Sequence, residues 1–317
     1  MGNAVRCYTG YALSLLGSVH IAHRPMFVSV EPSAVCQLRC PECPVGHGAV
    51  SPRNSKAGRP PFMSSEVWQR TLDEIKRHAH TVQFYFQGEP LLNPNLPQMI
   101  SQAHAEGLYT IVSTNAQAMT EPMAEALVSA GLDRIIVSMD GLSEESYRAY
   151  RVGGSLAKTK EALRMLRAAK ERLHAHITIE LQCLRLRTNE QEWQDFKRQY
   201  KSLGADTLTF KTAQLYNYTH GHPLMPSDPR YSRYVASGNS SLYHRRPLHR
   251  GCLRVWSGVV ITTDGEVLPC CYDKSHAYAY GNIMNAPLRE LYNNEKALAF
   301  RRAAFRETPQ ICQECWK

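Results

Sequence analysis

Short apolar runs and amphipathic stretches alternate six times between residues 26 and 211. Each unit opens with a run rich in β-branched and aromatic residues and continues with apolar side chains at helical spacing. The predicted strands are residues 26–31, 82–86, 108–113, 134–139, 176–182 and 207–211. Six alternations with short connections predict an α/β fold, with a parallel sheet and helices outside it.

Capping residues mark several of the predicted helices. Ser64 and Thr120 each precede an apolar stretch of helical spacing and are expected N-caps. Asn189 and Glu192 have the spacing of a capping box before the helical pattern that begins near Trp193. These signals divide residues 64–204 into helices between the strands.

The predicted strands are not uniformly apolar, because one face of each turns polar toward its C-terminal end. The polar positions are Ser29, Glu31, Gln83, Tyr85, Ser113, Asn115, Ser138, Asp140, Glu180, Gln182, Thr209 and Lys211. Burying such groups without partners costs about 1–3 kcal/mol each. Since α/β folds bind ligands at the C-terminal ends of their strands, we predict a polar cavity there.

The remainder of the chain has a different pattern. Residues 1–25 are an N-terminal segment, and residues 212–251 form a long loop, which we regard as a candidate substrate lid. A hairpin is predicted from Val255–Thr263 and Glu266–Leu268, with Asp264 and Gly265 at its turn. A helix is expected over 288–305, and residues 252–317 read as a small appended domain.

Composition narrows the class of protein. The 317 residues are 43% hydrophobic and 21% charged, which argues against disorder, and we expect no membrane segment. The net charge of +9 permits an anionic ligand, but the bases are scattered, so a nucleic-acid partner is unlikely on this pattern. Ten cysteines gathered in clusters indicate metal ligands rather than disulfides and agree with a cytoplasmic location.

The first cysteine cluster is the sharpest chemical signal. Cys36, Cys40 and Cys43 follow the first predicted strand and bring three thiolates onto one short loop. A closed structural metal site takes four ligands, so three thiolates leave one coordination position open for chemistry. Zinc held with a distant histidine is the alternative that the spacing leaves open.

This Cys-x-x-x-Cys-x-x-Cys spacing after a strand resembles the radical S-adenosylmethionine (SAM) superfamily. The resemblance implies a partial (β/α)6 barrel over residues 26–211. It also implies a [4Fe–4S] cluster held by the three thiolates, with SAM on the fourth iron. In that family the reduced cluster cleaves SAM to a 5′-deoxyadenosyl radical, which requires an electron donor such as flavodoxin or ferredoxin.

Other positions carry the same resemblance and imply SAM-binding roles. The segment Gln87, Gly88, Glu89 and Pro90 is similar to the family's Gly-Gly-Glu-Pro motif for the SAM amino group. Ser113, Asn115, Ser138 and Asp140 match the strand ends that hold the ribose and methionyl groups, and Arg151 and Gln182 are further candidates. Gln87 replaces a glycine of the motif, and Glu42 stands where the family usually has an aromatic residue.

A second set of cysteines closes the sequence. Cys252, Cys270, Cys312 and Cys315 resemble the start of the SPASM pattern, in the truncated form called a twitch domain. This implies a second, fully ligated [4Fe–4S] cluster suited to electron transfer. A four-cysteine zinc knuckle is the alternative, and Cys271 could replace Cys270 as a ligand. Cys183 points to the helix side of its strand and is expected in the core.

The two clusters lead to three hypotheses about function. The first is an oxidoreductase that dehydrogenates a small alcohol or sugar, with the auxiliary cluster as electron acceptor. The second is a peptide maturase that forms a crosslink, thioether or epimer, and the third is a non-enzymatic zinc or nucleic-acid-binding protein. Lys211 and Tyr85 are candidates for holding the substrate or taking its proton, and the basic segment 244–254 could clamp an anionic substrate.

Overall fold

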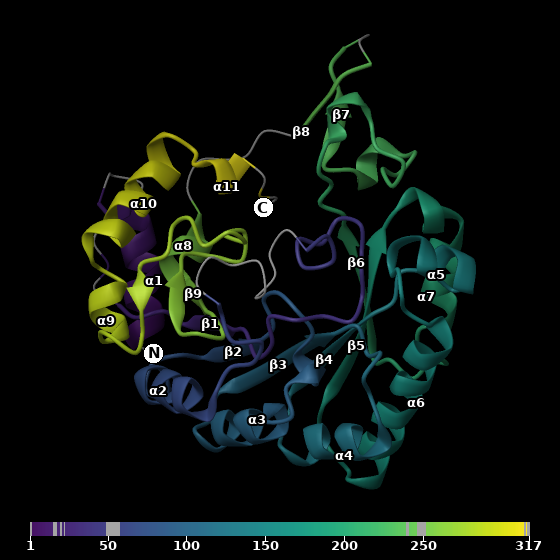
Figure 1. Ribbon diagram of the computed structural model, residues 1–317, viewed down its shortest axis with the longest axis horizontal. Coiled ribbons are helices and arrows are strands. Elements are labelled where there is room, and N and C mark those ends of the chain that lie inside the picture. Colours follow the sequence, from purple (N-terminus) through teal and green to yellow (C-terminus); the bar gives the residue numbers. More distant parts are fainter. Residues whose placement is uncertain are drawn as a thin grey trace.

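The computed structural model describes residues 2–14, 18–19, 21, 23–48, 58–238, 241–245, 252–313 and 315. Six parallel strands form the centre of its main sheet, which confirms the predicted α/β architecture. They are β1 (Phe27–Val30), β2 (Thr81–Phe84), β3 (Tyr109–Thr114), β4 (Arg134–Ser138), β5 (Thr178–Arg185) and β6 (Thr207–Thr212). The sheet curves into a partial barrel that is open at β6 (Figure 1).

Helices cover the convex face of the sheet, as Figure 1 shows. They are α2 (Ser65–Ile75), α3 (Leu96–Ala105), α4 (Glu121–Ser129), α5 (Glu144–Tyr150), α6 (Leu156–Arg172) and α7 (Trp193–Gln199), with a 3₁₀ turn at Pro90–Leu92. The side chains of Ser64 and Thr120 accept from the backbone amides of Val67 and Met123, so both predicted N-caps are confirmed.

The main hydrophobic core lies between these helices and the outer face of the sheet. It contains Val28, Phe84, Val112, Val137 and Leu181 from five neighbouring strands, all fully buried. Cys183 belongs to the same core and not to a cysteine cluster, which confirms the expectation for that thiol. The apolar face of each strand therefore packs on helices and leaves the polar face turned into the barrel.

The predicted capping box at Asn189 is wrong. Residues Arg187–Glu192 form a 3₁₀ turn, and the buried Asn189 amide donates to the carbonyl oxygens of Asp140 and Leu184, at 2.9 and 2.8 Å. The carboxylate of Glu192 accepts from the Leu142 amide instead of capping α7. Contacts with a neighbouring strand end thus outweigh the local helix signal.

The C-terminal part differs from the prediction at two places. Val255 lies in a short helix, α8 (Leu253–Ser257), so the hairpin begins only at β9 (Gly258–Ile261), which precedes β10 (Glu266–Leu268) and β11 (Gly281–Asn282). The single helix expected over 288–305 is split into α9 (Leu288–Leu291) and α10 (Glu295–Arg306), because Asn294 caps the second. A last helix, α11, spans Gln310–Gln313.

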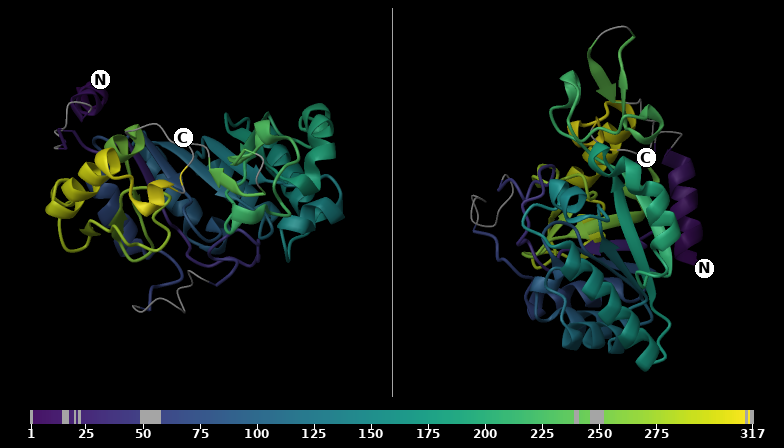
Figure 2. Two further views of the ribbon diagram at one scale, coloured as in Figure 1. Left: turned by 90° about the horizontal axis from the view of Figure 1, so that it is seen from above. Right: turned by 90° about the vertical axis from the view of Figure 1, so that its right-hand side faces the viewer.

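The C-terminal hairpin continues the barrel sheet. β9 pairs in parallel with β1, with Phe27 opposite Gly258 and Val30 opposite Ile261, and the full order is β11-β10-β9-β1-β2-β3-β4-β5-β6. Helix α1 (Gly2–Ser14), drawn in purple in Figure 2, contacts α8. The rings of Tyr11 and Trp256 lie 6.1 Å apart there. The N-terminal helix therefore packs on the start of the C-terminal region.

The described residues between 213 and 245, which leave out 239–240, carry little regular structure. Two 3₁₀ turns there, Tyr218–His220 and Pro229–Tyr231, precede the antiparallel pair of β7 (Tyr234–Ala236) and β8 (Tyr243–Arg245). The middle of the basic segment 244–254 lies outside the described residues. None of the helices in the described ranges has the length and apolar character needed to cross a bilayer.

Candidate active site

The first three predicted metal ligands lie on one compact loop after β1. Cys40 is buried, and the Cys43 amide donates to its carbonyl oxygen at 3.1 Å. The loop is so tight that a side chain at Gly46 would come within 2.6 Å of the Cys40 carbonyl oxygen. Burial raises the pKa of Cys36 to about 12, and the neighbouring thiols of Cys40 and Cys43 add to this rise. The three thiols therefore lie together, and a metal must displace their protons to bind.

Gly88 occupies a position that only glycine fits. Its φ is +67°, and a Cβ atom there would come within 2.2 Å of the Ser33 carbonyl oxygen on the segment before the cysteine loop. The Gln87 side chain donates to the Lys274 carbonyl oxygen at 3.0 Å and so reaches the C-terminal region. The motif thus seats the loop after β2 against the segment that leads into the cysteines.

Glu89 is buried among backbone and side-chain donors at the end of β3. Its carboxylate accepts from the Thr114 hydroxyl at 2.6 Å, the Asn115 amide at 2.8 Å and the Leu91 amide at 3.1 Å. Burial raises the pKa of this carboxyl group, and the hydrogen bonds oppose the rise. A carboxylate offers about four acceptor positions, so one remains for an ammonium group.

The end of β3 contacts the cysteine loop directly. The Asn115 side-chain amide donates to the Cys36 sulfur at 3.4 Å, and its oxygen accepts from Gln37 at 3.1 Å. Ser113 is half-buried on the same strand. The structure therefore brings Asn115, one of the two third-strand candidates, to the first cysteine.

Asp140 and Arg151 form an ion pair beside the second cysteine. The Arg151 Nε lies 2.6 Å from Asp140 Oδ2, and Arg151 Nη1 lies 3.9 Å from the Cys40 sulfur. Burial disfavours the guanidinium, but Asp140 and the Cys40 thiol raise the pKa of Arg151 well above its usual value. Ser143 caps α5, so the Asp140 carboxylate is not the cap of that helix. Ser138 and Gln182 lie opposite each other in the register of β4 and β5.

The second cysteine set gathers at the C-terminal end of the chain. Cys252 begins α8, Cys270 follows β10, and Cys312 lies in α11. Burial raises the pKa of Cys270, and the nearby Cys271 and Cys312 raise it further. Burial also raises the pKa of Cys315, and Cys252 and Cys271 add to that rise. The five thiols therefore lie together, and the choice between Cys270 and Cys271 as ligand stays open.

Within the described ranges, no three Cys, His, Asp or Glu side chains converge as they would around a single ion. A cluster that takes each thiolate on a different iron does not need such convergence.

Family comparison decides the class of these two thiol centres. Residues 30–181 match the model of the Radical SAM superfamily, and residues 252–316 match the SPASM iron–sulfur cluster-binding domain. The chain is a radical SAM enzyme with a SPASM domain. Its cofactors are a SAM-binding [4Fe–4S] cluster and an auxiliary iron–sulfur cluster, and the non-enzymatic hypothesis falls away.

Curated relatives include the PqqA peptide cyclase of Xanthomonas campestris pv. campestris strain 8004. It is 25% identical over 320 residues, which cover 92% of this chain and 80% of the relative. Among solved structures, anSMEcpe with bound AdoMet has a TM-score of 0.65 at 18% identity, covering 89% of this chain and 81% of that one. SuiB of Streptococcus suis bound to precursor peptide SuiA has a TM-score of 0.67 at 13% identity, covering 96% and 74%. These structures show the fold.

Two of the polar strand positions lie in surroundings other than the predicted cavity. Glu31 is fully buried in an ion pair with Arg59, and it also accepts from the Thr263 amide at 3.2 Å. Glu31 therefore fastens the C-terminal turn to the barrel. Lys211 is exposed on the edge strand β6.

Tyr85 is the other catalytic candidate. It is half-buried, and burial raises its pKa to about 12, with the Cys271 thiol adding to the rise. A phenol with this pKa keeps its proton near neutral pH. Of the two roles predicted for Tyr85, hydrogen-bond donation to a substrate fits this environment better than proton removal.

A cavity of about 520 Å³ lies between the cysteine loop and the C-terminal region of this radical SAM enzyme. His47 comes from the loop, Gln214 and Tyr216 from the segment after β6, and Tyr272, Lys274 and Tyr278 from the segment after Cys271. Its surface is mostly apolar. The sequence carries no signal for this cavity, because its walls come from four segments that lie far apart in the chain.

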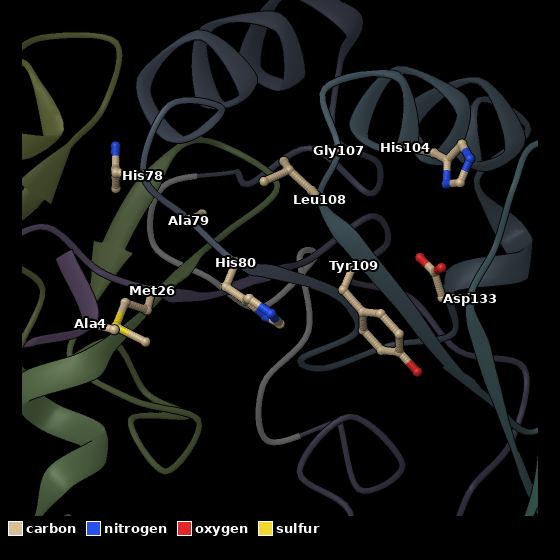
Figure 3. A pocket seen from close by; sticks show the side chains of 10 residues that line it. All are labelled: Ala4, Met26, His78, Ala79, His80, His104, Gly107, Leu108, Tyr109 and Asp133. Carbon is tan, nitrogen blue, oxygen red and sulfur yellow. The ribbon is translucent and has the colours of Figure 1, made fainter. Parts of the chain in front are cut away.

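A second cavity, of about 510 Å³, lies at the opposite end of the barrel (Figure 3). His80, Tyr109 and Asp133 line it at the N-terminal ends of β2, β3 and β4, together with His78 and His104. The cysteine loop and the strand-end residues described above lie at the C-terminal ends. This second cavity is therefore separate from the cofactor site.

Proposed function

We propose that this radical SAM enzyme carries out a two-electron oxidative modification of a peptide, with the modified side chain in the cavity of about 520 Å³. The position of that cavity is the observation that carries the proposal. It borders both the loop with Cys40 and Cys43 and the segment after Cys271, so a substrate there lies between the two cofactors. The name of the PqqA peptide cyclase agrees with a peptide substrate.

The lining favours a side chain over a sugar. Tyr216, Tyr272 and Tyr278 provide apolar ring surface, and a few polar groups such as Gln214 and Lys274 lie among them. Sites of this kind bind ligands through apolar contact and use a small number of polar groups for orientation. A polyhydroxylated ring would leave more of its hydroxyls without partners.

The residues of this chain prepare the site for bound cofactors. When bound, the two clusters and SAM supply a radical that abstracts a hydrogen atom and an acceptor for the electron that leaves the substrate. Glu89 is placed to hold an ammonium, and Arg151 is placed to hold a carboxylate. In total the substrate loses two hydrogen atoms, one of them as a proton and an electron. The reaction also requires a one-electron donor such as flavodoxin or ferredoxin. We expect the enzyme to work in the cytoplasm.

A small alcohol or sugar remains the second candidate substrate. The observation that favours it is the polar inner face of the barrel, where the Ser29 hydroxyl donates to Gln83 at 3.1 Å and Ser138 and Gln182 lie further along. A solved structure of similar fold is BtrN in complex with AdoMet and 2-DOIA, with a TM-score of 0.50 at 17% identity, covering 88% of this chain and 87% of that one.

The test uses reconstituted, reduced protein with SAM under anaerobic conditions. Candidate precursor peptides and a panel of sugars and amino alcohols are compared for release of 5′-deoxyadenosine and for loss of the mass of two hydrogen atoms. Turnover of a peptide supports the proposal, and turnover of small molecules alone replaces it with the second candidate. The triple variant Cys36→Ala, Cys40→Ala, Cys43→Ala should release no 5′-deoxyadenosine.

The role of the auxiliary centre is tested separately. The double variant Cys312→Ala, Cys315→Ala should still cleave SAM while forming no oxidised product, because the substrate radical then lacks its electron acceptor. A folded double variant that forms product at the wild-type rate would contradict an electron-transfer role.

A further inference from the structure

Glu42 occupies a special place on the cysteine loop, between Cys40 and Cys43. The family usually has an aromatic residue at this position, but here it is an acid whose side chain is only 8% exposed. Its Oε2 accepts a hydrogen bond from the backbone amide of Tyr216, which lies 174 residues further along the chain. Its Oε1 lies 3.3 Å from Nε2 of His222. Both partners belong to the segment that follows β6.

His222 approaches the other carboxylate oxygen of Glu42. The Nδ1 atom of His222 accepts from the Leu224 amide at 3.2 Å, and its Nε2 faces the carboxylate at ion-pair distance. Glu42 thus contacts one segment twice, through a hydrogen bond from its backbone and through the imidazole of His222.

The segment that Glu42 holds is packed in place. A second hydrophobic cluster joins Leu38 and Cys40 of the cysteine loop to Leu215, Leu224 and Tyr234. The Tyr234 hydroxyl accepts from the Leu215 amide at 2.7 Å and donates to its carbonyl oxygen at 2.9 Å. In the described part of 212–245, these residues form a wall rather than an open loop.

The same wall lines the cavity in which we place the substrate. Gln214, Tyr216 and Asn217 face it, opposite Tyr272 and Tyr278. Asn217 has a left-handed φ of +53°, so the backbone turns sharply directly after Tyr216. A small change in the tether at Tyr216 would therefore move the cavity wall relative to the cysteine loop.

We propose that Glu42 is a positioning residue, which ties the wall formed by Gln214, Tyr216 and Asn217 to the loop that carries the SAM-binding cluster. It thereby sets the placement of the substrate relative to the cofactor. This inference rests on the proposed function in one respect, because it takes that cavity as the substrate site. The family's aromatic residue is replaced by a carboxylate that holds the substrate side of the site instead.

The test compares Glu42→Ala with Glu190→Ala in the reconstituted holoenzyme. Glu190 is a matched control, since its carboxylate accepts from the Ser227 amide at 2.9 Å and holds another part of the same segment outside the cavity. Glu42→Ala should raise KM for the peptide about tenfold, the equivalent of about 1.4 kcal/mol from the lost hydrogen bond with Tyr216 and the lost contact with His222. It should also increase the ratio of 5′-deoxyadenosine to modified peptide. Glu190→Ala should keep both values within about twofold, well below that tenfold effect.

A second readout does not depend on turnover. Hydrogen exchange at the Tyr216 amide should be accelerated at least tenfold in Glu42→Ala and unchanged in Glu190→Ala, because only the first variant removes its acceptor. Glu42→Gln, which keeps one acceptor oxygen, should show an intermediate rate. If the wild-type enzyme modifies no peptide, the proposed function fails. The exchange rates still show in that case whether Glu42 holds the Tyr216 amide. The inference would be overturned if Glu42→Ala kept both the wild-type exchange rate at the Tyr216 amide and the wild-type ratio of 5′-deoxyadenosine to modified peptide. Loss of iron from the SAM-binding cluster in this variant would overturn it as well.

Discussion

At the scale of single residues, the site depends on close contacts around the cysteine loop. Gly88 combines a left-handed backbone with a close approach to Ser33, so two independent penalties act against any side chain there. Asn115 and Arg151 each reach one cysteine sulfur from a different strand end. These contacts hold the cysteine loop against the ends of two strands.

Alanine substitutions at Gly88 and Gly107 distinguish the cost of the left-handed backbone from the cost of the clash with Ser33. Gly88→Ala should lower the free energy of unfolding by about 3 kcal/mol or more, from the left-handed backbone and the clash with Ser33. Gly107→Ala is the control, because its φ is +75° but the space around it is open. It should cost only about 1–2 kcal/mol in urea unfolding. Equal losses in the two variants would show that the clash is relieved by movement of the loop.

Two tyrosines with raised pKa values, Tyr85 and Tyr234, make stability depend on pH. Burial raises the pKa of Tyr85 and of Tyr234 to about 12, above the value of about 10 in an unfolded chain. Between these pKa values the unfolded chain loses protons that the folded protein keeps. The stability is therefore fully present below about pH 10 and is lost toward pH 12, by about 1.4 kcal/mol per pH unit for each tyrosine.

Urea unfolding at about pH 9 and pH 11, on either side of the unfolded-state pKa, measures this loss. Tyr85→Phe should flatten the pH dependence relative to wild type, because one titrating group is removed. An unchanged slope would mean that Tyr85 does not keep its proton in the folded protein.

At the scale of elements, helix α8 lies beside the C-terminal cysteines. It follows Cys252 and carries Arg254, whose Nη1 lies 3.0 Å from the Cys271 sulfur. Cys271 raises the pKa of Arg254, and Cys252 and Cys315 contribute as well. A fixed positive charge therefore faces the thiols that we propose as ligands of the second cluster.

Arg254→Met should lower the reduction potential of the auxiliary cluster by an amount on the order of tens of millivolts. The physical reason is that net charge and hydrogen bonds to the sulfurs set the potential of iron–sulfur clusters. Arg254→Lys, which keeps the charge, should recover part of the shift in a redox titration followed by electron paramagnetic resonance. A potential that stays the same in both variants would place the guanidinium outside the cluster's electrostatic environment.

The helices also show where a capping signal in the sequence fails to predict the structure. The N-caps at Ser64 and Thr120 are predicted correctly, because each side chain bonds to its own helix. Asn189 carries an equally good local signal, yet its amide bonds to Asp140 on another strand end. A capping residue next to a functional strand end can therefore serve the tertiary structure instead of the helix.

At the scale of the whole molecule, the auxiliary region is built into the barrel. β9 pairs with β1 over Phe27 to Val30, and Glu31 joins Arg59 and Thr263 at the end of the same strand. The two cofactor regions thus share one sheet, with the tyrosine-lined cavity between them.

A chain that ends after Arg245 tests this integration. It would leave β1 without β9 and would expose the apolar residues Val28 and Val30 at the new edge. We expect such a truncated protein to aggregate or to unfold at lower urea than the full chain, as measured by light scattering and circular dichroism. A truncated chain of full-length stability would show that the barrel is an independent unit.

The sequence by itself determined the six strand–helix units and the three-cysteine loop. Periodicity and short spacings encode these features locally. Only the tertiary structure decided that β9 joins β1, that Gly88 lies against Ser33, that Glu42 holds Tyr216, and that tyrosines from two distant segments line one cavity. The reason is physical: such contacts join residues far apart in the chain, and they depend on how whole elements pack rather than on any pattern that neighbouring residues carry.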